Sequence, residues 1–345
     1  MYLLFEVGSM MNGENVLIVA TMKNEGPYVL EWVAHHLSIG VDGILVFTND
    51  CDDLTDRMLD RLEQIAPVFH RPNPKSLFPD RGNWQVMALR YARLFSVYKD
   101  AGWIYHTDAD EFLQVHVGDG VLEDFHSAAS DRAGRFDAVS FTSIPFSSGG
   151  HKELEDRPVV EQFTCLNKPY ARLRSENSQA INAIKTMYRN DVAFDLRRNH
   201  RPLMKEFSAA GLVWIDGSAN VLPPQFTDGK DKAIDAIGST ELAQMNHYAI
   251  KSAEAFLIKL ERGDVAGVSR LDSDSKYWEN YNTVGDADAR FAAMRPTTRR
   301  LLDEFAADPI LGEMHEQSFA IHKAKAKRLR NDPAWAEMVR RLGLG

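Results

Sequence analysis

The first third of the chain alternates short apolar runs with longer stretches in which apolar residues recur every three or four positions. The runs "VLIVA" (16–20) and "GILVF" (43–47) are continuous, which is typical of strands buried on both faces of a sheet. Between them a helix is predicted to begin at Pro27 and to end at Gly40. The alternation continues with helices at 52–65 and 83–100 and strands at 68–70 and 103–107. This order predicts an α/β protein with a mixed, mostly parallel sheet flanked by helices.

Beyond residue 115 the pattern becomes mixed. The predicted strands are 136–146, 159–166, 185–189 and 211–215. The segment "LAQMNHYAIKSAEAFLIKLERGD" predicts a strand that runs into a helix, and from about residue 287 the chain is helical and charged. We therefore expect one α/β domain over residues 1–265 and a helical C-terminal extension over 266–345 that packs on it.

Three acids, Asp108, Asp110 and Glu111, follow the apolar run "GWIYH" within a few positions. Acids crowded at the end of a buried strand repel one another and lose hydration. Either water solvates them on a loop, or a positive group lies among them. Ligands of such sheets bind beyond the carboxyl ends of the strands, so these acids are expected to face a ligand crevice. Other polar residues at such strand ends are Asn24, Glu25, Asn49, Asp50 and Asp53.

The Asp-x-Asp spacing is weak evidence alone, since the chain holds four such pairs. Two lie in polar loops near residues 272 and 286, and the pair at 50–52 leads into a helix, where capping explains acids adequately. The pair Asp108/Asp110 closes a strongly apolar strand, where two carboxylates can bind Mg²⁺ or Mn²⁺ together with water and phosphate oxygens. A solvated acidic turn or a helix cap explains the spacing equally well.

Composition excludes several classes of protein. With 345 residues, a net charge of −9 and an isoelectric point near 5.7, the chain lacks the basic surface that broad nucleic-acid binding needs. Its two cysteines, Cys51 and Cys165, match no zinc spacing, so a reducing compartment is expected. The first residues show neither a signal peptide nor a transmembrane segment, which predicts a cytoplasmic protein. The basic segment "HKAKAKRLRND" leaves peripheral membrane association open, although a solvated helix face explains it more simply.

Several ordered motifs resemble the family-2-like glycosyltransferases of the GT-A fold, and more closely the bacterial branch related to the glycosyltransferase family 92 group. The motifs are the segment 16–63, "YHTDADEF" and "NHYAIKSAEAFLIKLERGD", and the resemblance covers roughly residues 15 to 265. It implies a GT-A (Rossmann-like) sheet and transfer of a sugar from a nucleotide-diphospho-sugar, with inversion. It does not specify the sugar.

The resemblance also implies which residues contact the nucleotide. Asn24 and Glu25 match the turn after the first strand, and Asp53 matches the acid after the second. In the resembled family these positions lie around the base and the ribose. Leu54 departs from the pattern, because many relatives carry Gly at that position.

The implied metal site uses the acidic motif and a late histidine. Asp108 and Asp110 match the metal-binding motif, with Asp110 as the direct ligand and Asp108 nearer the ribose. His247 matches the histidine that completes metal coordination, and Lys251 would approach the diphosphate. Imidazole suits Mn²⁺ better than Mg²⁺, so Mn²⁺ is the expected ion.

Two further segments are candidates for binding the donor sugar and the acceptor. Arg81 or Gln85 could reach the donor sugar, and a solvated first helical turn is an equal alternative. The Gly-rich stretch "FSSGGHKE" resembles a segment that lies on the acceptor side in the family, which nominates His151, although a hairpin loop explains it as well. The candidate general bases are Glu153, Asp156 and Glu176.

A basic region and several tryptophans have two interpretations each. The basic residues are either a solvated face or an electropositive wall for the diphosphate or an anionic acceptor. They are Lys185, Arg189, Arg197, Arg198, His200 and Arg201. Trp84, Trp214 and Trp278 could stack on a sugar, but tryptophan is more often part of the core.

These observations together predict a metal-dependent glycosyltransferase that uses a nucleotide-sugar donor, UDP-linked by expectation, and a carbohydrate acceptor in surface polysaccharide or related glycan synthesis. One alternative is a non-catalytic carbohydrate-binding or scaffolding protein derived from a transferase. The retained Asp108, Asp110, His247 and Lys251 argue against such decay. The other alternative is a metal-dependent phosphohydrolase, which would carry its acidic pair after the first strand, where this chain has "TMKNEG".

Overall fold

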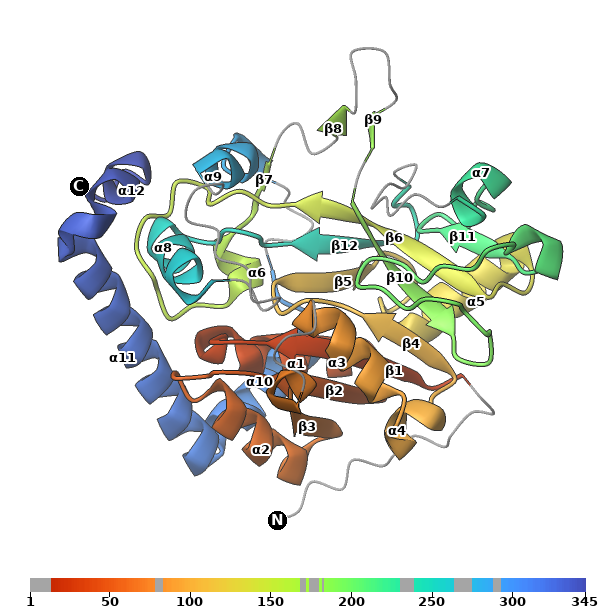
Figure 1. The fold of residues 1–345 in the computed structure, drawn as a ribbon, viewed down its shortest axis with the longest axis horizontal. Helices are drawn as coiled ribbons and strands as arrows, with labels where there is room; N and C mark the ends of the chain where they lie inside the picture. Colours follow the sequence, from red (N-terminus) through yellow and green to blue (C-terminus); the bar gives the residue numbers. More distant parts are fainter. Residues whose placement is uncertain are drawn as a thin grey trace.

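The computed structural model describes residues 14–77, 83–167, 172–173, 180–181, 183–229, 239–263, 275–287 and 293–345. Its main strands are β1 (Val16–Met22), β2 (Gly43–Thr48), β3 (Val68–Pro72), β4 (Trp103–His106), β5 (Glu111–Val115), β6 (Ala138–Pro145), β10 (Ile184–Arg189), β11 (Trp214–Asp216) and β12 (Ala243–His247). They form one sheet in the order β3-β2-β1-β4-β10-β6-β12-β5, with β11 beside β6. Figure 1 shows β1 to β4 in one half of the molecule and β5, β6, β10 and β12 in the other.

The sheet is mixed and mostly parallel, which confirms the predicted fold class. β1 pairs in parallel with β2 and β4, and β2 with β3. β6 is parallel to β11 and β12, whereas β10 runs antiparallel to both β4 and β6, and β5 runs antiparallel to β12. The acidic residues 108–111 therefore lie where the parallel half of the sheet meets the mixed half.

The helices cover both faces of the sheet. Among them are α1 (Gly26–Ser38), α2 (Thr55–Ile65), α3 (Trp84–Ala92), α4 (Ser96–Lys99), α5 (Leu122–Ala133), α8 (Ala253–Arg262), α10 (Pro296–Ala307), α11 (Pro309–Asn331) and α12 (Ala336–Arg341). Alternate residues of β1 explain the two layers: Ile18 packs in one core cluster with residues of α1, and Val19 packs in a second with residues of α3. A strand buried on both faces needs apolar residues at every position, as its sequence has.

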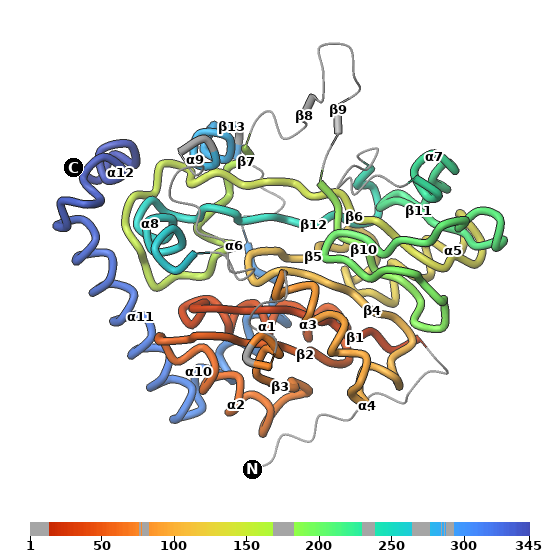
Figure 2. Tube along the Cα trace, viewed as in Figure 1, coloured from red at the N-terminus to blue at the C-terminus, as the bar shows by residue number. Residues whose placement is uncertain are grey.

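The C-terminal helices share the main core. Leu301 and Phe305 of α10 and Leu311 of α11 belong to the same apolar cluster as β1 and α1. Figure 2 shows α11 passing along one side of the molecule, next to α2 and α8. The expected domain boundary near residue 265 falls outside the described residues and stays a prediction. None of the described helices combines the length and the apolar character that a membrane crossing requires.

Two predicted elements differ from the structure. The predicted helix 83–100 is broken into α3 and α4, because Phe95 turns its ring toward Phe47 and Tyr91. The predicted strand 159–166 is wrong: the short helix α6 (Val159–Gln162) precedes β7 (Cys165–Asn167). The carboxylate of Glu31 accepts hydrogen bonds from the N–H groups of residues 159 and 160 at 2.6 and 3.1 Å, which satisfies the helix start.

Candidate active site

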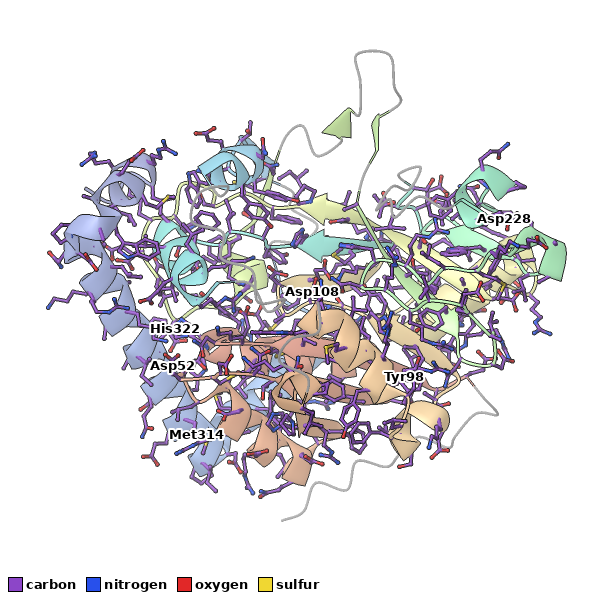
Figure 3. All side chains as sticks on the ribbon, viewed as in Figure 1. Asp52, Tyr98, Asp108, Asp228, Met314 and His322 are labelled. Carbon is purple, nitrogen blue, oxygen red and sulfur yellow. The ribbon has the colours of Figure 1, made fainter. Side chains whose placement is uncertain are left out.

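The acidic turn lies between β4 and β5 and is held from two sides. The indole N–H of Trp32 donates to the carbonyl oxygens of Asp108 and Glu111, both at 3.0 Å. The carbonyl of Asp110 accepts from the N–H of Tyr248 at 2.8 Å. In the antiparallel pairing of β5 with β12, residue 247 lies opposite residue 111, which brings the histidine predicted from the late motif next to the turn. Figure 3 shows Asp108 near the middle of the molecule.

A buried lysine neutralises the first acid of the motif. The Nζ atom of Lys185 lies 2.7 Å from Asp108 Oδ2 and 3.1 Å from Glu111 Oε2. The other oxygen of Asp108 accepts from Gln85 Nε2 at 2.7 Å. Burial opposes ionisation of Asp108, but the lysine charge outweighs burial and lowers the pKa of this carboxyl, whereas burial raises the pKa of Glu111. The positive group that the crowded acids require is therefore a lysine of this chain.

The second acid of the motif contacts a lysine and a histidine. Lys259 Nζ lies 2.8 Å from Asp110 Oδ2, and His247 Nε2 lies 3.7 Å from Asp110 Oδ1. Burial again opposes ionisation, but Lys259 and His247 lower the pKa of Asp110. Burial lowers the pKa of His247 to about 4, so its imidazole is neutral at pH 7 and carries a free electron pair.

Asp110 and His247 fit a divalent cation that takes its other ligands from outside the protein. Within the described ranges, no three His, Cys, Asp or Glu side chains converge closely enough to hold a metal by themselves. Mg²⁺ and Mn²⁺ sites commonly use one or two protein ligands and complete the shell with water and phosphate oxygens. Asp108 lies beside this pair, with its oxygens accepting from Gln85 Nε2 and Lys185 Nζ, and its predicted share in binding the metal stays a prediction.

A small pocket next to Asp110 is rich in basic side chains. Lys251, Lys259 and Arg262 line it together with Glu25 and Asn24. Arg262 is ion-paired with Glu25, and Lys251 Nζ lies 4.0 Å from the same carboxylate. Asn24 and Lys251 have positive φ angles of 53° and 54°, so both turns adopt the left-handed conformation. The structure thus gathers residues predicted from two motifs into one pocket, Asn24 and Glu25 from the first and Lys251 from the second.

Asp53, whose predicted contact with the nucleotide stays a prediction, is bonded within the protein interior. Its Oδ2 accepts from Gly26 N at 2.9 Å and lies 2.7 Å from His322 Nε2, and its Oδ1 accepts from the backbone and hydroxyl of Thr55 at 3.0 and 2.6 Å. Both oxygens are used inside the protein, and the residue is fully buried. Asp53 therefore joins the starts of α1 and α2 to α11, where Figure 3 labels His322.

Leu54, the next residue, is where the sequence departs from the pattern that the resemblance implies. Its φ angle is 71°, in the left-handed region that favours glycine. A Gly at this position would adopt the same conformation without strain.

The predicted acceptor-side residues lie apart from the acidic turn. His151 packs against Phe163, with ring centroids 5.6 Å apart, and Glu153 is exposed. Asp156 Oδ1 lies 2.9 Å from His315 Nε2 on α11. No hydrogen bond or ion pair between described residues joins these three side chains to the turn at 108–111. The remaining candidates, Glu176 and Arg81, lie outside the described residues.

Half of the basic region is buried rather than solvated. Lys185, Arg197 and Arg201 are buried, and the guanidinium of Arg201 lies over the rings of Trp214 and Phe226 at 4.5 and 4.2 Å. Trp214 and Trp278 belong to core clusters, whereas Trp84 is partly exposed beneath Lys75. The basic residues of α11 mostly pair with acids of the chain, including Lys325 with Asp52, Arg328 with Glu261 and Arg330 with Glu254.

Sequence reasoning missed two basic residues of the site, Lys259 and Arg262, and named Lys185 only as a member of the basic region. Lys185 occupies a buried position of β10, where a charge indicates a buried partner. Lys259 and Arg262 are three residues apart on α8, so both face the pocket that Lys251 lines, and this spacing was visible in the sequence.

The fold and the site agree with the GT-A glycosyltransferases that the motifs resemble. The sequence comparison also finds a glycosyltransferase. No family model matches the chain. A glycosyltransferase family 92 protein of Ricinus communis is 22% identical over 180 residues. The match covers 50% of this chain but only 31% of that protein, so the chain spans about a third of the relative's length.

Solved structures give weak likenesses. Glucosyl-3-phosphoglycerate synthase from Mycobacterium tuberculosis, in complex with Mn²⁺ and UDP, is 19% identical, with 38% of this chain and 44% of that chain covered and a TM-score of 0.24. The S. aureus protein TarS, residues 1–349 with UDP, is 9% identical, with 92% and 91% covered and a TM-score of 0.31. Because these TM-scores are low, the proposals below do not use the solved structures and rest on the residues of the site and on the sequence similarity.

Proposed function

We propose that the chain is a metal-dependent glycosyltransferase that moves a sugar from a nucleotide-diphospho-sugar, UDP-linked, to a hydroxyl of a carbohydrate acceptor. The observation that carries the proposal is the meeting of Asp110 and His247 beside a pocket lined by Lys251, Lys259 and Arg262. A carboxylate and a neutral imidazole suit a divalent cation, and basic side chains suit a diphosphate. The sequence similarity to a glycosyltransferase family 92 protein supports the same class of reaction.

Each residue of the site would have a separate role in binding the metal ion or the donor. Asp110 and His247 would hold Mn²⁺, or Mg²⁺ as the second choice, and the bound ion would neutralise charge on the diphosphate leaving group. Lys251 and Arg262 would bind diphosphate oxygens, while Asn24 would face the nucleoside. Lys185 keeps the Asp108 carboxylate ionised and fixed beside Gln85, so that Asp108 can accept a hydrogen bond from the ribose or the sugar.

The reaction itself would be a single displacement with inversion at the anomeric carbon. The acceptor hydroxyl attacks that carbon while a general base removes its proton and the diphosphate leaves. Glu153, Asp156, Glu176 and His151 stay candidates for the base or for acceptor binding. We infer cytoplasmic action in the synthesis of a surface polysaccharide or related glycan, and the two free cysteines suit a reducing compartment.

Thermal unfolding tests the proposal at the level of binding. A nucleotide present at about 100 times its dissociation constant stabilises the folded state by about 2.7 kcal/mol, which is visible as a shift in melting temperature. UDP with Mn²⁺ should shift the wild type and the surface variant Asp303→Ala, and should not shift Asp110→Ala. If UDP and Mn²⁺ leave the melting temperature of the wild type unchanged, the transferase assignment loses its support and a binding protein without catalysis becomes the better account.

A further inference from the structure

The ammonium group of Lys259 is paired with the Asp110 carboxylate, which the proposed metal ion would also bind. Its Nζ atom lies 2.8 Å from Asp110 Oδ2 and 2.7 Å from the carbonyl oxygen of Ala249. The lysine side chain is 26% exposed and that of Asp110 only 11%, so water screens this contact poorly. The same carboxylate faces His247 with its other oxygen.

A divalent cation bound by Asp110 and His247 would lie close to the Lys259 ammonium. Like charges at such short distances repel strongly where water is scarce. Either the ammonium moves away from Asp110 or the metal binds weakly. The two cations therefore compete for one carboxylate as long as no other anion is present.

Among the described residues that line the pocket around Lys259, no carboxylate is free to pair with the displaced ammonium. Glu25 is the acid among the described residues that line this pocket, and it already pairs with Arg262 and faces Lys251. The remaining charged groups there, Lys251 and Arg262, are positive. An anion that enters the pocket from solution would supply the missing partner for Lys259.

We propose that Lys259 is a positioning residue that moves from Asp110 to the diphosphate of the donor when the divalent ion binds. This inference rests on the proposed function, because it takes a nucleoside diphosphate as the entering anion. It follows that metal and nucleotide bind cooperatively: the diphosphate removes Lys259 from Asp110, and the metal releases Lys259 for the diphosphate. Such coupling is reciprocal, and its usual size is about 5- to 150-fold in affinity.

The test is a titration of the full chain with Mn²⁺, followed by the electron paramagnetic resonance signal of the free ion, with and without UDP. The wild type should bind Mn²⁺ at least about tenfold more tightly when UDP is present. Lys259→Met should bind Mn²⁺ alone about tenfold more tightly than the wild type and should lose most of the effect of UDP. Lys259→Arg retains the cation and should keep the coupling. Lys327→Met, an exposed lysine of α11, is the matched control and should behave as the wild type.

The outcomes separate this inference from the proposed function. If the wild type binds Mn²⁺ equally well with and without UDP, the movement of Lys259 is refuted, while the transferase assignment stands. The same holds if Lys259→Met and the wild type bind Mn²⁺ alone with the same affinity. If neither Mn²⁺ nor UDP binds the wild type, the proposed function and the inference both fail. Melting curves verify that each variant is folded, and Lys259→Gln, which also removes the cation and has the same expected results, replaces Lys259→Met if that variant does not fold.

Discussion

Replacement of Lys185 by methionine tests the assignment of a buried cation to the acidic turn. The lysine side chain is fully buried and lies within 3.1 Å of two carboxylates, those of Asp108 and Glu111. Methionine fills a similar volume but leaves both acids without their cation. Breaking a buried ion pair from one side typically costs about 3–5 kcal/mol, because a charge stays buried without a partner.

The loss of unfolding free energy should come from carboxylates that are left buried without a cation, and not from altered packing. Lys185 keeps Asp108 ionised, whereas burial raises the pKa of Glu111, so Asp108 accounts for the larger share of the penalty. Asp108→Asn in the Lys185→Met background removes this stranded charge and should recover about half of the lost free energy.

Urea unfolding of the metal-free protein measures these differences, with Lys327→Met as the control for loss of a surface lysine, expected within about 0.5 kcal/mol of the wild type. A loss below about 1 kcal/mol for Lys185→Met would refute the reasoning. A double variant no more stable than Lys185→Met would refute it as well, because the penalty would then come from packing.

Three further changes probe the parts that hold the site. Burial alone would raise the pKa of Asp53, but its hydrogen bond and charge interaction with His322 lower it to about 2. Its stabilising contribution is therefore complete above about pH 4 and is lost as the pH falls toward 2, by about 2–3 kcal/mol, and acid titration of Asp53→Asn should lack this loss. Trp32→Phe removes two hydrogen bonds to the acidic turn, which should lower the free energy of unfolding by about 1–3 kcal/mol and weaken UDP binding measured by calorimetry. Gly26→Ala places a Cβ that overlaps Ser318 Oγ and lies 2.9 Å from the carbonyl of residue 53. It should cost about 1–3 kcal/mol in chemical unfolding, with partial recovery when Ser318→Gly is added.

Much of the fold could be predicted from local sequence patterns. A strand buried on both faces has a continuous apolar run, and a helix buried on one face has apolar residues every three or four positions. The continuous apolar run of β1 is such a pattern, and Pro27 and Gly40 predicted the limits of α1 (Gly26–Ser38) to within two residues. The strand predicted over residues 159–166 was wrong because of a tertiary contact. Its first residues are apolar and β-branched, but Glu31, more than a hundred residues away in sequence, caps them as a helix.

The sequence predicted the acidic residues of the site better than its basic residues. The position of Asp110 and His247 followed from motifs, since both stand at strand ends that the sheet brings together. The partners of these acids depend on the pairing of distant strands and helices, which a single sequence does not reveal. Lys185 on β10 and Lys259 on α8 meet the turn only after the sheet has formed.

Release of UDP from a panel of UDP-sugars, in the presence of Mn²⁺ and mixed oligosaccharide acceptors, tests sugar transfer most directly. The wild type should release UDP from at least one donor, and the product should carry the inverted anomeric configuration. Asp110→Asn should lower the rate about 100-fold or more, because it weakens a metal ligand that supports the leaving group, while Asp303→Asn should leave the rate unchanged. Equal rates for Asp110→Asn and the wild type, or no release from any donor by the wild type, would contradict the account.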